Sequence, residues 1–264
     1  TYFSNFIASN PEPVFWTLLF VVLTIVVVAF GVQNGIERLN RVLMPALIIL
    51  SVALSIYSCM LPGALDGLYY YLVPNLSAVS INTVVAAMGQ MFYSLSLAMG
   101  IMITYGSYVR RDDDLEKSVR TIEIFDTGIA FLAGLMIVPA VFAFSGGEAS
   151  AVSAGPSLMF ITLPEVFDSI PFGGIIGLLF FLLVVFAALT SAISLTETVI
   201  SIVQDRSGWP RKVSVVVTGI GIALLAILPT LGFSTLSGVV FDIGASQMTI
   251  LDFMDFISNS VLMP

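Results

Sequence analysis

Apolar residues run in long stretches along the chain, and charged residues fall mainly between them. The stretches cover residues 14–32, 42–62, 84–109, 119–145, 172–204, 213–232 and 246–264. Because a helix needs about 20 apolar residues to cross the hydrocarbon core of a bilayer, each of the first six stretches is long enough for one membrane span. The pattern predicts an all-α polytopic membrane protein with a single transmembrane domain, in which residues 146–171 form the longest connecting loop.

The basic residues indicate which ends of the spans face the cytoplasm. All nine Lys and Arg lie in three clusters, each between two apolar stretches: Arg38 and Arg41; Arg110, Arg111, Lys117 and Arg120; and Arg206, Arg211 and Lys212. The other connectors carry acids but no basic residue. Because positively charged loops stay on the cytoplasmic side, this alternation predicts that residue 1 lies on the outer side of the membrane.

The composition agrees with a membrane protein and excludes several classes of enzyme. The residues are 58% hydrophobic and 10% charged, whereas a soluble domain has roughly 25% charged residues. The chain has no His and a single cysteine, Cys59, which excludes Ser-His-Asp and Cys-His catalysis, histidine-ligated metals and an intrachain disulfide. The remaining catalytic candidate is an acidic pair, Asp252 and Asp255, which has no matching acid at equal depth in another span. We therefore expect no enzymatic activity.

The two ends of the sequence are unusual for a complete inner-membrane protein. The chain begins at Thr1 with neither an initiator Met nor a signal peptide. Its last apolar stretch stops at Pro264, inside the run. We therefore expect the sequence to be the central part of a longer protein.

The third span contains residues that weaken a helix at the depth of the membrane centre. Two serines, Ser94 and Ser96, and Gly100 lie in the segment from Gln90 to Gly100. Serine competes for backbone hydrogen bonds and glycine disfavours helix, so this segment is predicted to unwind. Backbone groups freed in hydrocarbon cost several kcal/mol each unless a cavity, ion or ligand satisfies them, and secondary transporters use such broken helices. The alternative is that the small residues only allow two helices to pack closely.

Asp126 is an acid inside the fourth span. It lies about two helical turns beyond Arg120, which marks the cytoplasmic edge. Placing an ionisable group in a span costs roughly 2.5–3.5 kcal/mol, so the residue is expected to be functional and to need a cation or a proton. The alternative is an acid that reaches water at the interface.

A third polar feature lies in the fifth span. Ala187, Thr190 and Ser191 have the spacing i, i+3 and i+4, which places them on one helix face. Two hydroxyls and a nearby carbonyl offer neutral oxygens that suit a hard monovalent cation such as sodium. The alternative is that the hydroxyls bond only the carbonyls of the preceding helical turn.

These segments, taken together, resemble the neurotransmitter:sodium symporter family in its prokaryotic branch, which has the LeuT-type inverted-repeat fold. The segments that carry the resemblance are Gly35–Arg41 with Met44-Pro45, Gly89–Gly100 with Thr104–Tyr108, Asp126-Thr127 with Leu132–Gly134, Gly155-Pro156 with Phe160–Pro164, Ala187–Ser191, and Leu251–Phe256. The resemblance covers the whole chain, from about the fourth span to the middle of the tenth of twelve, and implies that the third apolar stretch is the family's unwound sixth span. Residues 146–171 are similar to the family's extracellular loop 4.

The resemblance implies two sodium sites and a substrate site. Sodium site 1 would use Ser94 and Asp126, and sodium site 2 would use Ala187, Thr190 and Ser191. The substrate site would be lined by Tyr93, Ser96, Ala98, Met99, Ser191 and Leu195. Asp255 resembles an outer-gate acid, and Tyr108 and Asp205 resemble parts of the inner gate.

The resemblance also implies a function, which is sodium-coupled amino acid symport by alternating access across the bacterial inner membrane. Met99 stands where an aromatic ring can close the pocket, and because Met is an adaptable side chain we expect a large hydrophobic or aromatic L-amino acid. Ala130 stands where chloride-dependent members carry Ser, which leaves chloride coupling open. The alternative function is a proton-coupled carrier of the same fold that uses Asp126 as the titrating acid. Neither the sequence nor the resemblance indicates the oligomeric state or a nucleic-acid partner.

Overall fold

The computed structural model describes residues 2–31, 36–97, 99–110, 113–145, 158–169, 172–243 and 246–258. The chain forms two compact units that alternate along the sequence. Unit 1 comprises Thr1–Asn40, Ala98–Tyr108 and Leu189–Pro264, and unit 2 comprises Arg41–Leu97 and Val109–Ala188.

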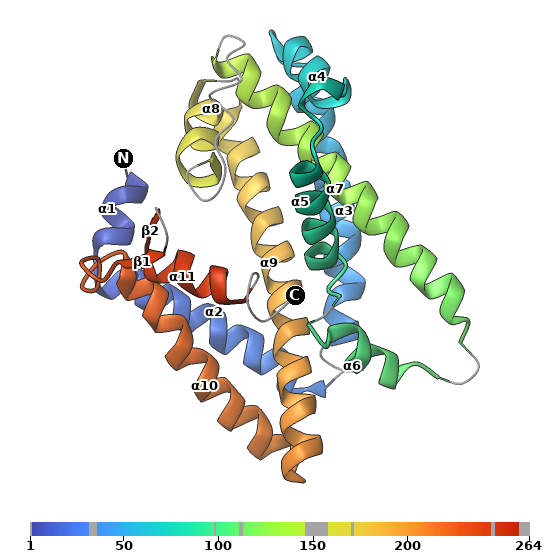
Figure 1. Cartoon of the computed structure of the whole chain (residues 1–264), viewed down its shortest axis with the longest axis vertical. Coiled ribbons are helices and arrows are strands. Elements are labelled where there is room, and N and C mark those ends of the chain that lie inside the picture. The colour runs from blue at the N-terminus through green and yellow to red at the C-terminus, as the bar shows by residue number, and fades with distance from the viewer. Residues whose placement is uncertain are drawn as a thin grey trace. The chain divides into compact units, whose positions relative to one another are not determined.

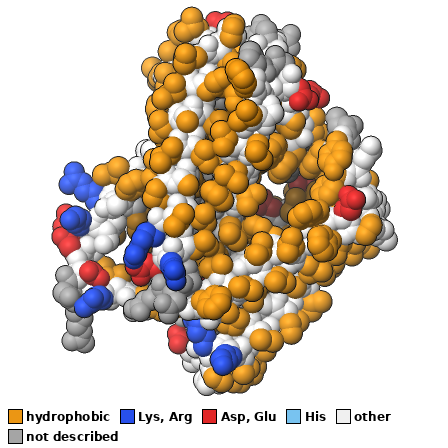
Figure 2. Space-filling view, turned by 180° about the vertical axis from the view of Figure 1, so that it is seen from behind, with side chains coloured by type: hydrophobic (Ala, Val, Ile, Leu, Met, Phe, Trp, Pro, Cys, Tyr) orange, Lys and Arg blue, Asp and Glu red, His pale blue; other side chains and the backbone are white. Residues whose placement is uncertain are grey.

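Within the described residues, five helices are long and apolar enough to cross a membrane (Figure 1). They are α2 (Pro11–Ala29), α3 (Arg38–Cys59), α7 (Leu115–Ser145), α9 (Gly173–Ser207) and α10 (Arg211–Gly232). Between 17% and 33% of the residues in their most apolar windows are buried inside the structure. Figure 2 shows that hydrophobic side chains cover most of the face it presents, with few charged groups. A surface of this kind requires lipid or other apolar partners as its surroundings, so the predicted helical membrane architecture is confirmed.

The third apolar stretch is two helices, as the sequence predicts. Helix α5 (Ile81–Ser94) begins with a capping box between Ser80 and Thr83 and ends at Ser94, and α6 covers Ile101–Tyr108. Between the two helices, Ser96 has a φ of 55° and Gly100 a φ of 76°, so the backbone leaves the helical conformation twice. The expected unwinding of this span is therefore confirmed.

Unit 2 packs around a core between α3, α7 and the first half of α9. Its short elements are α4 (Ala64–Leu72), the 3₁₀ turn η2 (Leu76–Ala78), the π-helical turn η4 (Leu158–Thr162) and α8 (Leu163–Ser169). The buried core residues are Leu47, Leu54, Met136, Val141, Leu163, Phe167, Phe180 and Leu183. Helix α4 lies close against α7 at Gly67 and Gly134, where an added Cβ would overlap Pro139 and Tyr71. Small residues thus permit the close contact between these two helices.

Unit 1 contains α1 (Tyr2–Ala8), α2, α6, the second half of α9 and α10. Helices α2 and α10 pack along their length, with Ile25 lying on Gly219. A second core cluster consists of Val28, Ile36, Ile193, Ile200 and Val215. After α10, the strands β1 (Phe241–Ile243) and β2 (Ser246–Met248) form an antiparallel hairpin.

The last apolar stretch differs in detail from the continuous run read from the sequence. Residues 246–248 form strand β2, and the helix α11 covers only Ile250–Phe256. Helix α11 begins where it does because Thr249 and Asp252 form a reciprocal capping box. Residues 259–264 lie outside the described residues.

Candidate functional site

A hydrogen bond connects the end of the broken helix to the acid in the fourth span. Ser94, the last residue of α5, donates from its Oγ to Oδ1 of Asp126 in α7 over 2.7 Å. Asp126 is eleven residues after Leu115, where α7 begins, which is about 16 Å along the helix axis at 1.5 Å per residue. An ionised carboxylate has about four lone-pair positions, so one hydroxyl donor leaves capacity for a hard cation. The structure therefore brings together the two residues predicted for sodium site 1.

The backbone beside this pair has an unusual conformation. Leu97 donates its N–H to the Phe92 carbonyl (2.9 Å), and Ser96 donates to the Tyr93 carbonyl (3.0 Å). This pair of bonds is a Schellman motif, with Ser96 at the left-handed position that glycine usually occupies. The left-handed conformation costs a non-glycine residue roughly 1–2 kcal/mol. Strain of this kind persists where the surrounding structure imposes it, and it is concentrated at binding sites.

The residues predicted for sodium site 2 all lie in α9. Thr190 is buried, Ala187 is half-buried and Ser191 is exposed. One turn further on, Ser194 donates from its Oγ to the Thr190 carbonyl over 3.1 Å. Helix geometry alone keeps Ala187, Thr190 and Ser191 on one side of α9.

The predicted substrate residues are distributed over both units. Tyr93 and Ser96 belong to unit 2, and Met99, Ser191 and Leu195 belong to unit 1. Tyr93 is 48% exposed and Leu195 is 45% exposed, so both side chains have surface that a ligand could contact. Ala98 lies outside the described residues, as do residues 146–157 and 170–171 of the predicted loop 146–171.

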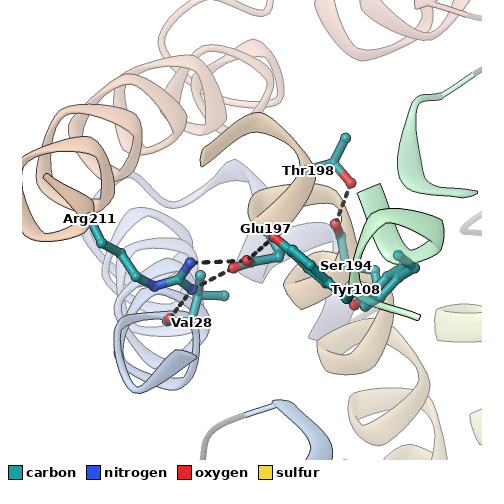
Figure 3. Close-up of polar contacts among 7 residues, drawn as sticks. Val28, Tyr108, Ser194, Glu197, Thr198 and Arg211 are labelled. Atoms are coloured by element: carbon teal, nitrogen blue, oxygen red, sulfur yellow. Dashed lines mark hydrogen bonds and ion pairs between the residues drawn. The ribbon is translucent and has the colours of Figure 1, made fainter. Parts of the chain in front are cut away.

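Tyr108, predicted for the inner gate, contacts a buried ion pair (Figure 3). Tyr108 donates from its hydroxyl to Oε1 of Glu197 over 2.8 Å. Arg211 donates to both carboxylate oxygens of Glu197, at 3.1 and 2.7 Å. Its Nη2 also donates to the Val28 carbonyl near the end of α2, over 2.8 Å. The network therefore joins α2, α6, α9 and α10 within unit 1.

Glu197 is the residue that the sequence reasoning missed. Its side chain is 0% exposed, and it accepts three hydrogen bonds from the two donors described above. The signal was present, because Glu197 is an acid inside the apolar stretch 172–204, which is the pattern that identified Asp126. In the sequence, Arg211 stands out only as one residue of a basic cluster. Asp205, predicted for the inner gate, is exposed in α9, eight residues beyond Glu197.

The two acids of the last helix have different surroundings. Asp252 accepts from the Thr249 hydroxyl (2.7 Å) and the Thr249 N–H (3.1 Å), which gives this carboxylate a helix-capping role. Asp255, predicted for the outer gate, lies one turn later in α11 and is exposed. The capping role of Asp252 argues against the acidic pair as a catalytic dyad.

A broken membrane helix that presents a hydroxyl to a partly exposed acid of a neighbouring helix is typical of secondary transporters. Within that class, a sequence model described as the sodium:neurotransmitter symporter family matches residues 8–261. The chain belongs to this family, as its motifs predict.

Relatives of the chain are sodium-dependent transporters. An uncharacterized sodium-dependent transporter of Haemophilus influenzae is 37% identical over 257 residues, which are 97% of this chain and 55% of the relative. YhdH of Bacillus subtilis, also described as an uncharacterized sodium-dependent transporter, is 35% identical over 262 residues, which are 99% of this chain and 56% of the relative. The chain therefore spans little more than half the length of these relatives.

A solved structure confirms the fold. The crystal structure of MhsT in complex with L-phenylalanine matches this chain with a TM-score of 0.87 and 43% sequence identity. The match covers 100% of this chain and 58% of the MhsT chain. The predicted LeuT-type fold, present here in part, is thereby confirmed.

Proposed function

We propose that this chain is the central part of a sodium-coupled amino acid symporter of the bacterial inner membrane, with residue 1 on the outer side. The observation that carries the proposal is the 2.7 Å hydrogen bond from Ser94 to Asp126, made where the third apolar stretch breaks. A full negative charge at this depth needs a cation, and oxygen ligands favour a hard cation such as sodium. Sodium site 1 therefore includes Ser94 and Asp126.

The second sodium ion binds to α9 in this proposal. Ala187 contributes its carbonyl, and Thr190 and Ser191 contribute their hydroxyls. The burial of Thr190 supports this role, because a site that excludes water strengthens each ion–oxygen contact. Three neutral oxygens are half of a typical shell for sodium, so the remaining ligands come from other segments of the complete protein.

The proposed substrate is a large hydrophobic or aromatic L-amino acid. It lies against the break between α5 and α6, where it contacts Tyr93, Ser96 and Met99, with Ser191 and Leu195 on α9. Two observations support this choice: Met99 adapts to bulky ligands, and the structurally similar MhsT was crystallised with L-phenylalanine. No role is assigned to chloride.

Coupling follows from differential binding. Sodium shifts the equilibrium between outward-facing and inward-facing states by as much as its affinities for the two states differ. In the proposed cycle, Asp255 belongs to the outer gate. Tyr108 and Asp205 belong to the inner gate, and the contact from Tyr108 to Glu197 holds α6 in the closed position until sodium and substrate are both bound; both leave when this gate opens. The sodium gradient thereby drives substrate inward.

The test is uptake of labelled L-phenylalanine in sodium and in choline, with this chain in its complete coding context in membrane vesicles. Asp126→Ala should raise the half-saturating sodium concentration at least tenfold, since it removes the only formal charge assigned to sodium site 1. Glu123→Gln is the matched control, because Glu123 is an exposed acid one turn earlier in α7. Thr190→Ala should weaken the sodium dependence through site 2.

Two results would change the proposal. Uptake that is driven by a pH gradient without sodium would identify the proton-coupled alternative, with Asp126 as the titrating acid. An unchanged sodium dependence in both Asp126→Ala and Thr190→Ala would remove both sodium sites.

A further inference from the structure

Two tyrosines of α6 make parallel hydrogen bonds to α9. Tyr105 donates from its hydroxyl to Ser194 Oγ over 3.0 Å, and Tyr108 donates to Glu197 over 2.8 Å. The partners in each bond are 89 residues apart in the sequence. Two residues three positions apart on α6 therefore bond two residues three positions apart on α9. The two rings also contact each other edge to face, with centroids 6.3 Å apart. Both bonds lie within unit 1, and together they fix the register of α6 on α9.

The bond from Tyr105 continues into α9 through a single hydroxyl. Ser194 accepts from Tyr105 and donates its own proton to the Thr190 carbonyl over 3.1 Å. A serine hydroxyl has one proton to donate, so this arrangement is directional: Tyr105 to Ser194 to Thr190. Serine that bonds the carbonyl four residues earlier alters the local helix geometry, and here that carbonyl belongs to the turn with the two hydroxyls of sodium site 2.

Tyr108 has no comparable route to the sodium site. Its partner Glu197 is already held by Arg211 at two oxygen atoms, so the carboxylate stays in place without the tyrosine. Within the described part of the chain, the Ser194 hydroxyl bonds Tyr105 and the Thr190 carbonyl, and its side-chain orientation depends on these two bonds. Tyr105 is therefore the tyrosine that links the position of α6 to the geometry of the helical turn containing Thr190.

We infer that Tyr105 is a positioning residue that couples the closed position of α6 to sodium binding at Thr190 and Ser191, through the hydroxyl of Ser194. This role rests on the proposed sodium site 2. By thermodynamic linkage, the factor by which sodium favours the closed position equals the factor by which the closed position favours sodium. Loss of the Tyr105 hydroxyl therefore reduces both together.

The test measures the position of α6 directly, without transport. The chain is used in its complete coding context, with Cys59→Ser and any other cysteine removed, and Thr104→Cys placed in α6, where Thr104 is 6% exposed. A membrane-impermeant thiol reagent is added to inside-out vesicles over a range of sodium concentrations. Labelling reports α6 leaving its closed position, and sodium should slow it in the parent protein.

Tyr105→Phe should increase the labelling rate in sodium and raise the half-protecting sodium concentration, each by about threefold, which is the average size of a hydrogen bond between membrane helices. Ser194→Ala should have the same effect, and the double variant should add nothing further, because both changes break one chain. Thr198→Val is the control: Thr198 donates to the Ser194 carbonyl rather than to its hydroxyl, and Val keeps the side-chain shape.

Each outcome separates this inference from the proposed function. If the half-protecting sodium concentration is the same in the parent and in Tyr105→Phe, Tyr105 has no positioning role and the symporter proposal stands. If Tyr105→Phe and Ser194→Ala add independently, the hydroxyl chain is wrong. If sodium does not slow labelling in the parent, sodium site 2 and the inference fall together. Thermal unfolding of each variant excludes misfolding as the cause.

Discussion

The buried ion pair between Glu197 and Arg211 predicts an unequal response to the loss of either partner. Glu197 is completely buried, whereas the Arg211 side chain is 31% exposed. Arg211→Met leaves a buried carboxylate with Tyr108 as its remaining donor among the hydrogen bonds described. Glu197→Gln leaves a guanidinium that reaches solvent and still donates to the Val28 carbonyl. The arginine variant should therefore be the less stable of the two.

The magnitudes follow from what each variant leaves behind. Removing one partner of a buried pair costs roughly 3–5 kcal/mol when the other charge is isolated, and Arg211→Met comes close to this case. Glu197→Gln loses charge-assisted bonds from a partly hydrated arginine that keeps other acceptors, which costs about 1–2 kcal/mol. In the double variant no buried charge remains, so its stability should lie within about 1–2 kcal/mol of the parent.

The assay is thermal unfolding of the detergent-solubilised protein at neutral pH, with Lys212→Met as the control. Lys212 is the neighbouring cation, and it is exposed, so its loss should have little effect. If Arg211→Met is as stable as Glu197→Gln, or if the double variant is the least stable of the three, the reasoning from burial is refuted.

Two further substitutions test local packing and backbone strain by the same unfolding measurement. Gly67→Ala should destabilise by about 1–3 kcal/mol, because its Cβ would lie 2.8 Å from the Pro139 Cα in the α7 backbone; Gly128→Ala, with no atom within 4 Å, is the control, and equal effects would contradict the close α4–α7 contact. Ser96→Gly should be about 1 kcal/mol more stable than Ser96→Ala, since glycine adopts the φ of 55° without strain. Both Ser96 variants should bind the proposed substrate more weakly, and unchanged affinity would exclude the hydroxyl as a contact.

The long helices could be predicted from sequence because lipid imposes a simple rule on composition. Every backbone polar group in hydrocarbon must be satisfied within the helix, so a span appears as an unbroken apolar run. Short elements outside the runs follow no such rule. Helix α4 depends on Gly67 and Gly134 for its contact with α7, and the hairpin β1–β2 lies in a segment whose apolar residues do not distinguish strand from helix.

The break in the third span was predictable, but the position of its partner was only partly so. Ser94, Ser96 and Gly100 together weaken a helix at one depth, which favours a break there. Asp126 is 32 residues from Ser94, and hydropathy gives the depth of each residue without the rotation of its helix. The contact between Ser94 and Asp126 depends on the tertiary structure, and only the resemblance to a family predicted it.

Glu197 was recognisable from sequence as an acid in a span, but its partner was not. Its charge was visible inside an apolar run, but its partner Arg211 lies at the start of the next helix, in a cluster that the positive-inside rule already explained. Arg211 can both help to set the topology and neutralise the buried Glu197, so its place in a basic cluster did not reveal its second role. Helix α9 thus combines the proposed sodium hydroxyls of Thr190 and Ser191 with the acid of the inner network, which follows within about two helical turns. The segment between them also contains Ser194, so the α9 partners of both α6 tyrosines lie within two helical turns of Thr190.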